Sequence, residues 1–321
     1  PSAIHVAAAL LLANGLLPAL QRCREAVLHK GEALKDVVKT GRTHLMDAMP
    51  VRFDQVLGGW AEQLHGNVLR LQSLQAQVQA LAQGGTAVGT GINAHPDFAA
   101  LFHTALSERT GLVFAPAAHY FAAMGSQDVA VALSGQLKTL AVTLLKIAND
   151  LRWMNSGPLA GLGEIELEAL QPGSSIMPGK VNPVIPEATA MVAAQVIGND
   201  AAITIAGQSG NFELNVMLPL VAHRLVDSLQ LLTHVLPLLA QCIATFRVRE
   251  EQLQAALSRN PILATALNPA IGYAKAAEIA KQAYAEGRPV LDVAVERTGL
   301  PRAQLAAWLD PAQLTHGGLQ H

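Results

Sequence analysis

Hydrophobic residues recur every three or four positions over long stretches of the chain, which is the spacing of one face of an α-helix. The clearest stretch runs from Phe53 to Gln83, with apolar residues at Val56, Trp60, Leu64, Val68, Leu71, Leu74, Val78 and Leu81. Similar stretches run from Ile4 to Val38, from Gln127 to Met154, from Asn215 to Phe246, and from after Pro186 to about Ile205. Because no sustained strand-like alternation competes with them, the pattern predicts an all-α bundle of long helices.

Proline and glycine positions predict where these helices bend and end. Pro18 is expected to kink the first helix, and Pro219 and Pro237 are possible bends in the stretch that contains them. Three segments rich in Gly, Thr, Ser or Pro are predicted loops: Thr40 to Pro50, Gly84 to Pro96, and Ser156 to Pro186. From about Arg249 the pattern changes to short helical pieces broken by prolines. We therefore expect a central bundle domain over residues 1–248 and a small C-terminal helical domain over 249–321.

The composition excludes several classes of protein. The 321 residues are 51% hydrophobic and 14% charged, whereas an ordinary soluble domain is about a quarter charged. This argues against disorder, and a net charge of −2 without any cluster of Lys and Arg argues against nucleic-acid binding. Two cysteines far apart in sequence, Cys23 and Cys242, favour buried thiols in a reducing, intracellular setting.

Two long uncharged stretches, Pro1 to Gln21 and Ser228 to Phe246, could be membrane spans on length alone. Both contain polar residues and proline, and neither has the Lys/Arg and aromatic flanks of a span. Buried helices of a bundle explain them better, with much of the apolar surface covered by partner subunits. We therefore predict no membrane association.

The loop from Gly173 to Pro183 has the sequence Gly-Ser-Ser-Ile-Met-Pro-Gly-Lys-Val-Asn-Pro. Its hydroxyls, cation and amide are the groups that bind a carboxylate by charge-assisted and neutral hydrogen bonds. A serine among backbone N–H groups could also act on a neighbouring C–H bond. On composition alone, an ordinary Gly/Ser/Pro surface loop remains the alternative.

Three further features could carry chemistry or be structural. His44 stands beside a hydroxyl in Gly41 to Asp47, and such a histidine is more often structural than catalytic. Glu187 follows Pro186 at a predicted helix start, where a carboxylate is stabilised by the helix dipole whatever its function. The glycine-rich segment Gly84 to Gly91 is not followed by the Gly-Lys-Ser/Thr of a nucleotide site, so a tight turn between helices is favoured.

Taken together, these segments resemble class II fumarases of the fumarase/aspartase superfamily. The long and specific match is Gly173 to Pro183 followed by Val-Ile-Pro-Glu-Ala, and the similarity includes Gly41 to Asp47, Gly84 to Gly91 and Gly210 to Val216. It continues through Asn268 to Tyr273 and Lys275 to Ala280, so it covers essentially the whole chain.

The resemblance implies reversible anti addition of water to fumarate, giving L-malate, with no metal and no organic cofactor. Ser174 would be the base, acting as an alkoxide, while Lys180 and Asn182 would hold the carboxylate on which negative charge develops. Because a free serine hydroxyl is too weak an acid to ionise near neutral pH, backbone N–H donors and the Lys180 cation would have to stabilise the anion.

The same resemblance assigns the remaining site residues and the assembly. His44 would act on the leaving hydroxyl, directly or through water, with Glu187 hydrogen-bonded behind it to set its tautomer and basicity. Thr43 and Ser175 would add hydrogen bonds to the substrate. The family implies a cytoplasmic homotetramer of the tricarboxylic acid cycle, with each active site built from three subunits, so His44 and Ser174 need not meet within one chain.

The chain departs from the family pattern in two respects. We expect an N-terminal domain ahead of Pro1, ending in a Ser-Ser-Asn-Asp run that supplies part of the substrate pocket. This segment alone is therefore expected to have little or no hydratase activity. In addition, Arg224 stands where many fumarases carry Asn.

There are two alternative functions, an ammonia-lyase and a non-catalytic structural protein. Aspartase, an ammonia-lyase on the same scaffold, typically has Ala at the position of Gly179 and a Gln-rich segment in place of Asn211 to Glu213, and both positions here are of the fumarase type. A non-catalytic structural member of the superfamily is the other alternative. The intact Ser174, His44, Glu187, Lys180 and Asn182 argue against it for the parent protein, but not for a truncated chain.

Overall fold

A computed structural model describes residues 1–318, which divide into two compact units. The first unit is made of Pro1–Ala26, Trp60–Arg152 and Ala169–Ile243. The second is made of Val27–Gly59, Trp153–Glu168 and the residues from Ala244 onward. The last three residues of the predicted C-terminal domain, 319–321, lie outside the described part of the chain.

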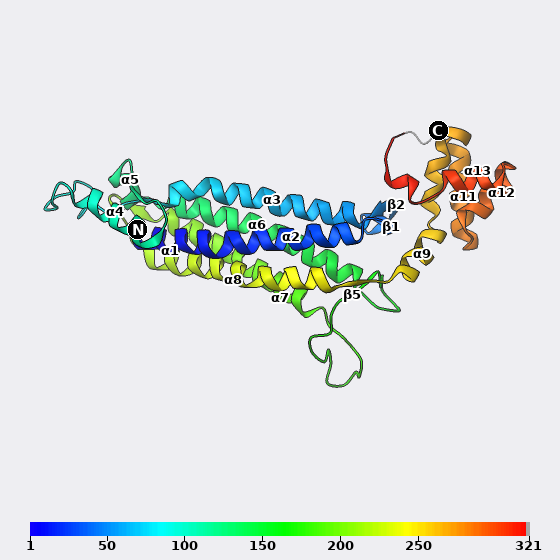
Figure 1. The fold of residues 1–321 in the computed structure, drawn as a ribbon, viewed down its shortest axis with the longest axis horizontal. Helices are drawn as coiled ribbons and strands as arrows, with labels where there is room; N and C mark the ends of the chain where they lie inside the picture. Colours follow the sequence, from blue (N-terminus) through cyan, green and yellow to red (C-terminus); the bar gives the residue numbers. More distant parts are fainter. Residues whose placement is uncertain (319–321) are drawn as a thin grey trace. The chain divides into compact units, whose positions relative to one another are not determined.

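Long helices dominate the first unit, as Figure 1 shows. They are α1 (Ser2–Leu11), α2 (Leu17–Ala33), α3 (Phe53–Val78), α6 (Asp128–Met154), α7 (Val184–Gly207) and α8 (Leu218–Thr245). Residues 27–33 of α2, 53–59 of α3 and the last two residues of α6 and of α8 belong to the second unit. Each predicted helical stretch is present, and the all-α bundle is confirmed. The helix predicted after Pro186 begins slightly earlier, at Val184, so this proline lies in the first turn, where its missing N–H has no helical partner to lose.

Polar pairs mark the contacts between neighbouring helices of the bundle. They are Asn67 with Thr143 at 3.1 Å (α3 with α6), Ser134 with Asp200 at 2.8 Å (α6 with α7), and Asn199 with Ser228 at 3.0 Å (α7 with α8). Around them the core is mostly leucine, with fully buried members that include Leu12, Leu20, Leu64, Leu133, Leu137, Leu140, Leu229 and Leu236. Aliphatic side chains of one size let long helices pack closely along their whole length.

The first helix changes its hydrogen-bond pattern ahead of Pro18. Residues Leu12–Leu16 form a π-helical turn between α1 and α2, in which the Leu17 N–H bonds to the carbonyl of Leu12, five residues back. Proline cannot donate a backbone hydrogen bond, and a π-turn is one way a helix absorbs such a break. The disturbance predicted at Pro18 therefore lies in the turn just before it.

Pro219 and Pro237 occupy different places in α8. This helix begins at Leu218, so Pro219 lies in its first turn, where it needs no N–H partner. Pro237 lies inside the helix, which continues to Thr245.

The segment Thr40 to Pro50 is not the loop that its composition predicted. It forms an antiparallel hairpin of β1 (Val38–Thr43) and β2 (Met46–Arg52). Its strands, of six and seven residues, do not alternate between buried and exposed positions, and one register shift lies between Thr40 and Arg42. The pairing is held by contacts from distant segments, which no local pattern records.

Shorter elements complete the first unit. They are α4 (Phe98–Thr110), α5 (Tyr120–Gly125), the parallel pair β3 (Ala80–Leu81) with β4 (Ala115–Pro116), and the antiparallel pair β6 (Gly210–Asn211) with β7 (Leu214–Asn215). Each of these strands is only two residues long. The pairs therefore hold loops together and do not form a core.

Short helices make up the C-terminal part of the second unit. These are α9 (Glu250–Arg259), the 3₁₀ segment Pro261–Leu267, α10 (Asn268–Ile271), α11 (Tyr273–Glu286), α12 (Val290–Thr298), α13 (Arg302–Trp308) and a 3₁₀ turn (Gln313–Thr315). They share a hydrophobic core that includes Leu267, Ile279, Val293 and Leu305. The predicted succession of short helical pieces is thus present. The two-stranded pair β5 (Ile165–Glu166) with β8 (Arg247–Val248) also belongs to this unit.

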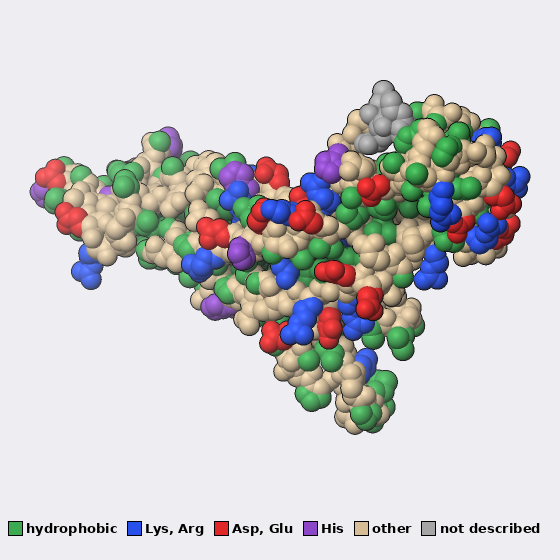
Figure 2. Space-filling view, turned by 45° about the vertical axis from the view of Figure 1, so that its right-hand side comes forward, with side chains coloured by type: hydrophobic (Ala, Val, Ile, Leu, Met, Phe, Trp, Pro, Cys, Tyr) green, Lys and Arg blue, Asp and Glu red, His purple; other side chains and the backbone are tan. Residues whose placement is uncertain are grey.

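Four helical stretches are long and apolar enough to cross a membrane by length and composition: Ser2–Ala33, Asp128–Met154, Val184–Gly207 and Leu218–Thr245. Within the chain, between 33% and 50% of each most apolar window is buried. The remaining apolar faces are open, and Figure 2 shows broad areas of uncharged surface between scattered charges. Large exposed apolar areas of this kind mark surfaces that another molecule covers.

Burial makes Cys23 chemically inert in the folded protein. The side chain is fully buried, and desolvation raises the pKa of its thiol from 9.0 to about 12. A raised pKa means less thiolate: at pH 9 about one thousandth of the folded thiol is ionised, against about half in the unfolded chain. We expect Cys23 to resist alkylation at pH 9 until the protein is denatured, as measured by peptide mass spectrometry. Equal labelling rates in native and denatured protein would contradict this.

Candidate active site

The loop that precedes α7 is closed by hydrogen bonds between its own ends. The Gly173 N–H donates to the carbonyl of Lys180 at 2.9 Å, and the Asn182 side-chain amide donates to the carbonyl of Gly173 at 2.9 Å. The backbones approach so closely that a Cβ at position 173 would lie 2.4 Å from the Lys180 carbonyl oxygen. Only glycine fits here. Figure 1 shows this loop extending beyond the N-terminal end of α7.

Ser174 sits inside the loop with its hydroxyl oxygen turned toward backbone donors. Its Oγ accepts hydrogen bonds from the N–H groups of Ile176, at 3.2 Å, and Met177, at 3.1 Å. Two N–H dipoles aimed at one oxygen stabilise negative charge on it. Ser174 and Lys180 both line a cavity of about 400 Å³ formed by residues 169–174 and 177–181.

The other loop residues surround this serine differently. Ser175 and the Lys180 side chain are exposed, while Asn182 is half-buried through its bond to Gly173. Glu187 is half-buried in the first turn of α7, where its backbone N–H bonds to the Pro183 carbonyl. Glu187 therefore lies beside the backbone N–H groups that begin the helix.

Thr43 and His44 are exposed at the tip of the β1–β2 hairpin. Thr43 pairs with Met46, so His44 and Leu45 form a two-residue turn, and both have positive φ angles, 55° and 61°. Such turns usually contain Asn-Gly, because bulky side chains are strained in the left-handed region. Leu45, whose side chain is the less suited of the two to this conformation, adds most to the strain of the turn.

The predicted site residues therefore fall into two groups. Ser174, Ser175, Lys180, Asn182 and Glu187 belong to the first compact unit, in one loop and the helix turn that follows it. Thr43 and His44 belong to the second compact unit. The loop with Ser174 and the turn with His44 are thus each built within one of the two units.

The two glycine-containing motifs outside this loop have structural explanations. Gly84 to Gly91 is a compact turn, in which the N–H groups of Gly89 and Gly91 both bond to the Gly85 carbonyl. In Gly210 to Val216, the buried Asn215 amide donates to the carbonyls of Ala206 and Gly207 and so caps the end of α7. Phe212, at the tip of the β6–β7 hairpin, is 92% exposed.

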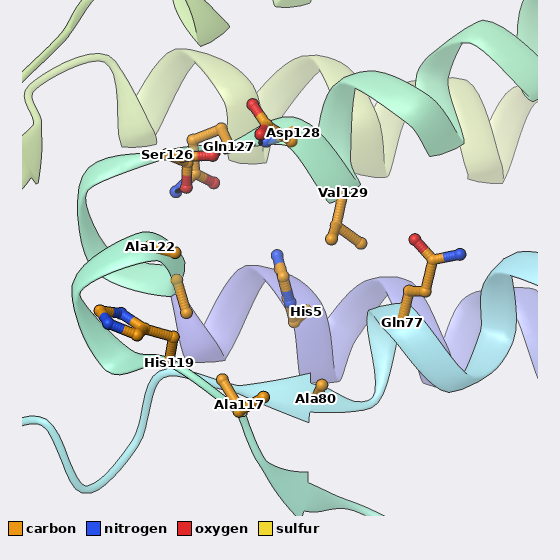
Figure 3. A pocket seen from close by; sticks show the side chains of 12 residues that line it. His5, Gln77, Ala80, Ala117, His119, Ala122, Ser126, Gln127, Asp128 and Val129 are labelled. Atoms are coloured by element: carbon orange, nitrogen blue, oxygen red, sulfur yellow. Dashed lines mark hydrogen bonds between the residues drawn. The ribbon is translucent and has the colours of Figure 1, made fainter.

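A second cavity of about 300 Å³ lies in the first unit and was not foreseen from the sequence. Figure 3 shows the ring of His5, from α1, rising from above Ala80 of β3 toward the start of α6. Burial lowers the pKa of His5, and a hydrogen bond with the backbone of Ala80 partly opposes that shift. Five of the twelve residues that line the cavity are alanines. Within residues 1–318, no group of three or more His, Cys, Asp or Glu side chains could hold a metal ion.

Sequence reasoning missed two buried polar residues next to the histidine turn. Glu164 bridges Lys39 and Arg42 of β1, and the Asn260 side chain donates to the carbonyl of Ala48 in β2. A charged residue inside Leu162-Gly163-Glu164-Ile165 was the available signal for the first. From the sequence, Asn260 ahead of Pro261 is typical of a helix N-cap, and nothing in the sequence indicates its bond to Ala48.

Known proteins are similar to this chain over nearly its whole length. The family described as Lyase matches residues 1–198, and the family described as Fumarase C C-terminus matches residues 263–316. A Pseudomonas aeruginosa protein named fumarate hydratase class II 2 is 68% identical over 99% of this chain and 70% of its own length. The chain belongs to the class II fumarate hydratase family. It spans about 70% of the length of such relatives.

Further relatives agree at lower identity. A fumarate hydratase class II of Xylella fastidiosa is 57% identical over 99% of this chain and 68% of its own length. The crystal structure of class II fumarase from Schistosoma mansoni superposes with a TM-score of 0.94 at 33% identity, over 98% of this chain and 69% of that one. The fumarase resemblance of the sequence and its helical fold are thereby confirmed.

The tight approach at Gly173 predicts the effect of a single methyl group. Gly173→Ala places its Cβ against the Lys180 carbonyl and should open the loop, since overpacking costs about 1–3 kcal/mol. We expect limited trypsin digestion to cleave after Lys180 about tenfold faster than in the unchanged protein. Gly58→Ala is the control, because its Cβ in α3 meets nothing within 4 Å. Equal cleavage rates in the two variants would show that the loop is not closed by this contact.

Proposed function

We propose that this chain carries the catalytic groups of a fumarate hydratase, which reversibly adds water to fumarate in the anti sense to give L-malate. The observation that carries the proposal is the environment of Ser174, whose Oγ accepts two backbone N–H bonds inside a closed loop. Membership of the class II fumarate hydratase family supplies the substrate class.

Ser174 is the base in the dehydration direction. Proton removal from the carbon beside a malate carboxylate requires an alkoxide, and a free serine hydroxyl does not ionise near neutral pH. The N–H groups of Ile176 and Met177 lie where they would stabilise that alkoxide, and the Lys180 cation belongs to the same loop. Preorganised donors of this kind require no rearrangement when charge develops.

Lys180 and Asn182 hold the substrate carboxylate. Removing the proton leaves a doubly charged aci-carboxylate, which a cation and an amide stabilise more than they stabilise the single charge of the ground state. The Asn182 side-chain amide donates one N–H to the Gly173 carbonyl, and its second N–H can bind the substrate. Thr43 and Ser175 add hydroxyl hydrogen bonds.

His44 handles the hydroxyl that leaves, and Glu187 orients it. An imidazole within reach of the leaving oxygen can deliver its proton directly or through water, and a carboxylate behind it fixes the tautomer. His44 is exposed in the left-handed turn at the hairpin tip, and Glu187 lies in the first turn of α7.

The assembly is a cytoplasmic homotetramer, with each site shared by three subunits. Its support is the open apolar surface of helices that are at most half buried within the chain, together with exposed apolar residues beside the site loops, such as Leu45 at 63% and Ile176 at 84%. Partner helices would cover these faces, so the long apolar helices need no membrane. No metal or organic cofactor takes part, and the reaction belongs to the tricarboxylic acid cycle.

Removing the proposed base should abolish turnover without affecting assembly. In the full-length protein, Ser174→Ala should lower kcat by on the order of 10²–10⁴-fold, the usual contribution of a positioned acid or base. Fumarate absorbance measures the rate, and size-exclusion chromatography measures the assembly. Ser258→Ala, on the exposed face of α9, is the control and should retain full activity. Unchanged turnover in Ser174→Ala would remove Ser174 as the base.

Substrate choice separates this function from that of an ammonia-lyase on the same scaffold. We expect fumarate to form from L-malate and not from L-aspartate when both are followed by fumarate absorbance. Gly179 has a φ of 82°, where an alanine would be strained, so the loop as it stands favours the fumarase residue. Fumarate release from aspartate alone would replace the hydratase assignment with aspartase.

A further inference from the structure

The hairpin that carries His44 is held by a buried charge cluster. The Glu164 carboxylate has 2% of its side chain exposed and lies 2.7 Å from Nη2 of Arg42 and 2.8 Å from Nζ of Lys39. The Arg42 contact is a hydrogen bond, while Oε2 meets the lysine as an ion pair without an aligned hydrogen bond. Lys39 is 7% exposed and Arg42 is 16% exposed, so little water screens the cluster.

The backbone of Glu164 is fixed as firmly as its side chain. Its N–H donates to the carbonyl of Met154, at the end of α6, and its carbonyl accepts from the N–H of Arg249. Glu164 is therefore held in place within the second compact unit. β1 contacts its carboxylate through two side chains, those of Lys39 and Arg42. Arg42 lies two residues before His44.

The opposite strand has its own buried anchor. The pairing register shifts between Thr40 and Arg42, so Ala48 and Met49 together face Gly41 alone. The Ala48 carbonyl in this bulge accepts a hydrogen bond from Asn260, at 2.9 Å, and Asn260 is 2% exposed. Bulges re-aim the strand that contains them, and here each strand is tied down close to the turn.

We propose that Glu164, acting through Arg42, is a positioning residue for His44. A two-residue turn with both φ angles positive would relax if the strands could twist, because neither His nor Leu favours that conformation. The charge cluster and the Asn260 bond prevent that movement, and so the imidazole is presented in one direction. This inference depends on the proposed function, since it assigns His44 to the chemical step.

The most informative variant is Arg42→Met, in the full-length protein. Removing Glu164 would take the shared carboxylate from both Lys39 and Arg42 and could unfold the unit. Removing Arg42 leaves the Lys39–Glu164 pair neutral and intact and keeps most of the side-chain volume. We expect kcat to fall by on the order of 10–100-fold with KM changed less than about twofold, because misplacing a catalytic group weakens only the transition state. Arg42→Lys, which keeps the charge, should recover part of the loss.

Arg249→Met is the matched control. Arg249 pairs with Glu166 at 3.5 Å across the neighbouring two-stranded pair, and both side chains are well exposed. Its backbone bond to Glu164 remains in the variant. It should leave kcat and KM unchanged.

A double-mutant cycle with His44→Asn decides whether Arg42 acts through the histidine. If it does, adding Arg42→Met to His44→Asn should lower the residual kcat by less than about twofold, because the misplaced group is already absent. Losses that multiply would overturn the positioning inference and leave the proposed function standing. A His44→Asn variant with unchanged kcat would overturn the assignment of His44 itself, and the inference with it.

Discussion

The structure depends on burying one face of each long, nearly uncharged helix. A leucine-rich stripe must be removed from water on one side by its neighbours within the chain. At most half of the most apolar window is buried in this way in Ser2–Ala33, Asp128–Met154, Val184–Gly207 and Leu218–Thr245. The polar pairs between helices, such as Asn199 with Ser228, lie within this apolar packing and fix which helix meets which. The proposed site residues lie in the connections between the helices, apart from Glu187 in the first turn of α7.

The two connections that carry the proposed site residues are stabilised in different ways. The loop before α7 is stabilised almost entirely from within, by Gly173, Lys180 and Asn182, so it can project from the bundle and still keep Ser174 among N–H donors. The β1–β2 hairpin is stabilised from outside, by Glu164 and Asn260. The internal hydrogen bonds of the loop place N–H dipoles around the oxygen of Ser174, the proposed base. The contacts of the hairpin with Glu164 and Asn260 fix the orientation of the turn that carries His44.

The sequence was most informative where a local rule decides the structure. Helical spacing located the long helices because tertiary packing uses the same apolar face that the spacing reveals. It missed the hairpin at Thr40 to Pro50, whose pairing depends on residues more than a hundred positions away, and it placed the disturbance at Pro18 only approximately, because the π-turn falls before it. The loop around Ser174 could be identified because its residues are contiguous. Glu164 could not, since its importance comes from being enclosed with Lys39 and Arg42, and burial of a single carboxylate leaves no periodic signal.

With the role proposed for His44, the left-handed turn at His44 and Leu45 places stability and activity in opposition. Asn-Gly at these two positions would remove the strain of the turn and should make the hairpin more stable. It would also delete the imidazole, and Leu45→Gly alone would loosen the backbone that directs it. A search for thermostable variants that scores only the folding free energy would therefore favour changes at the one turn that has to remain strained.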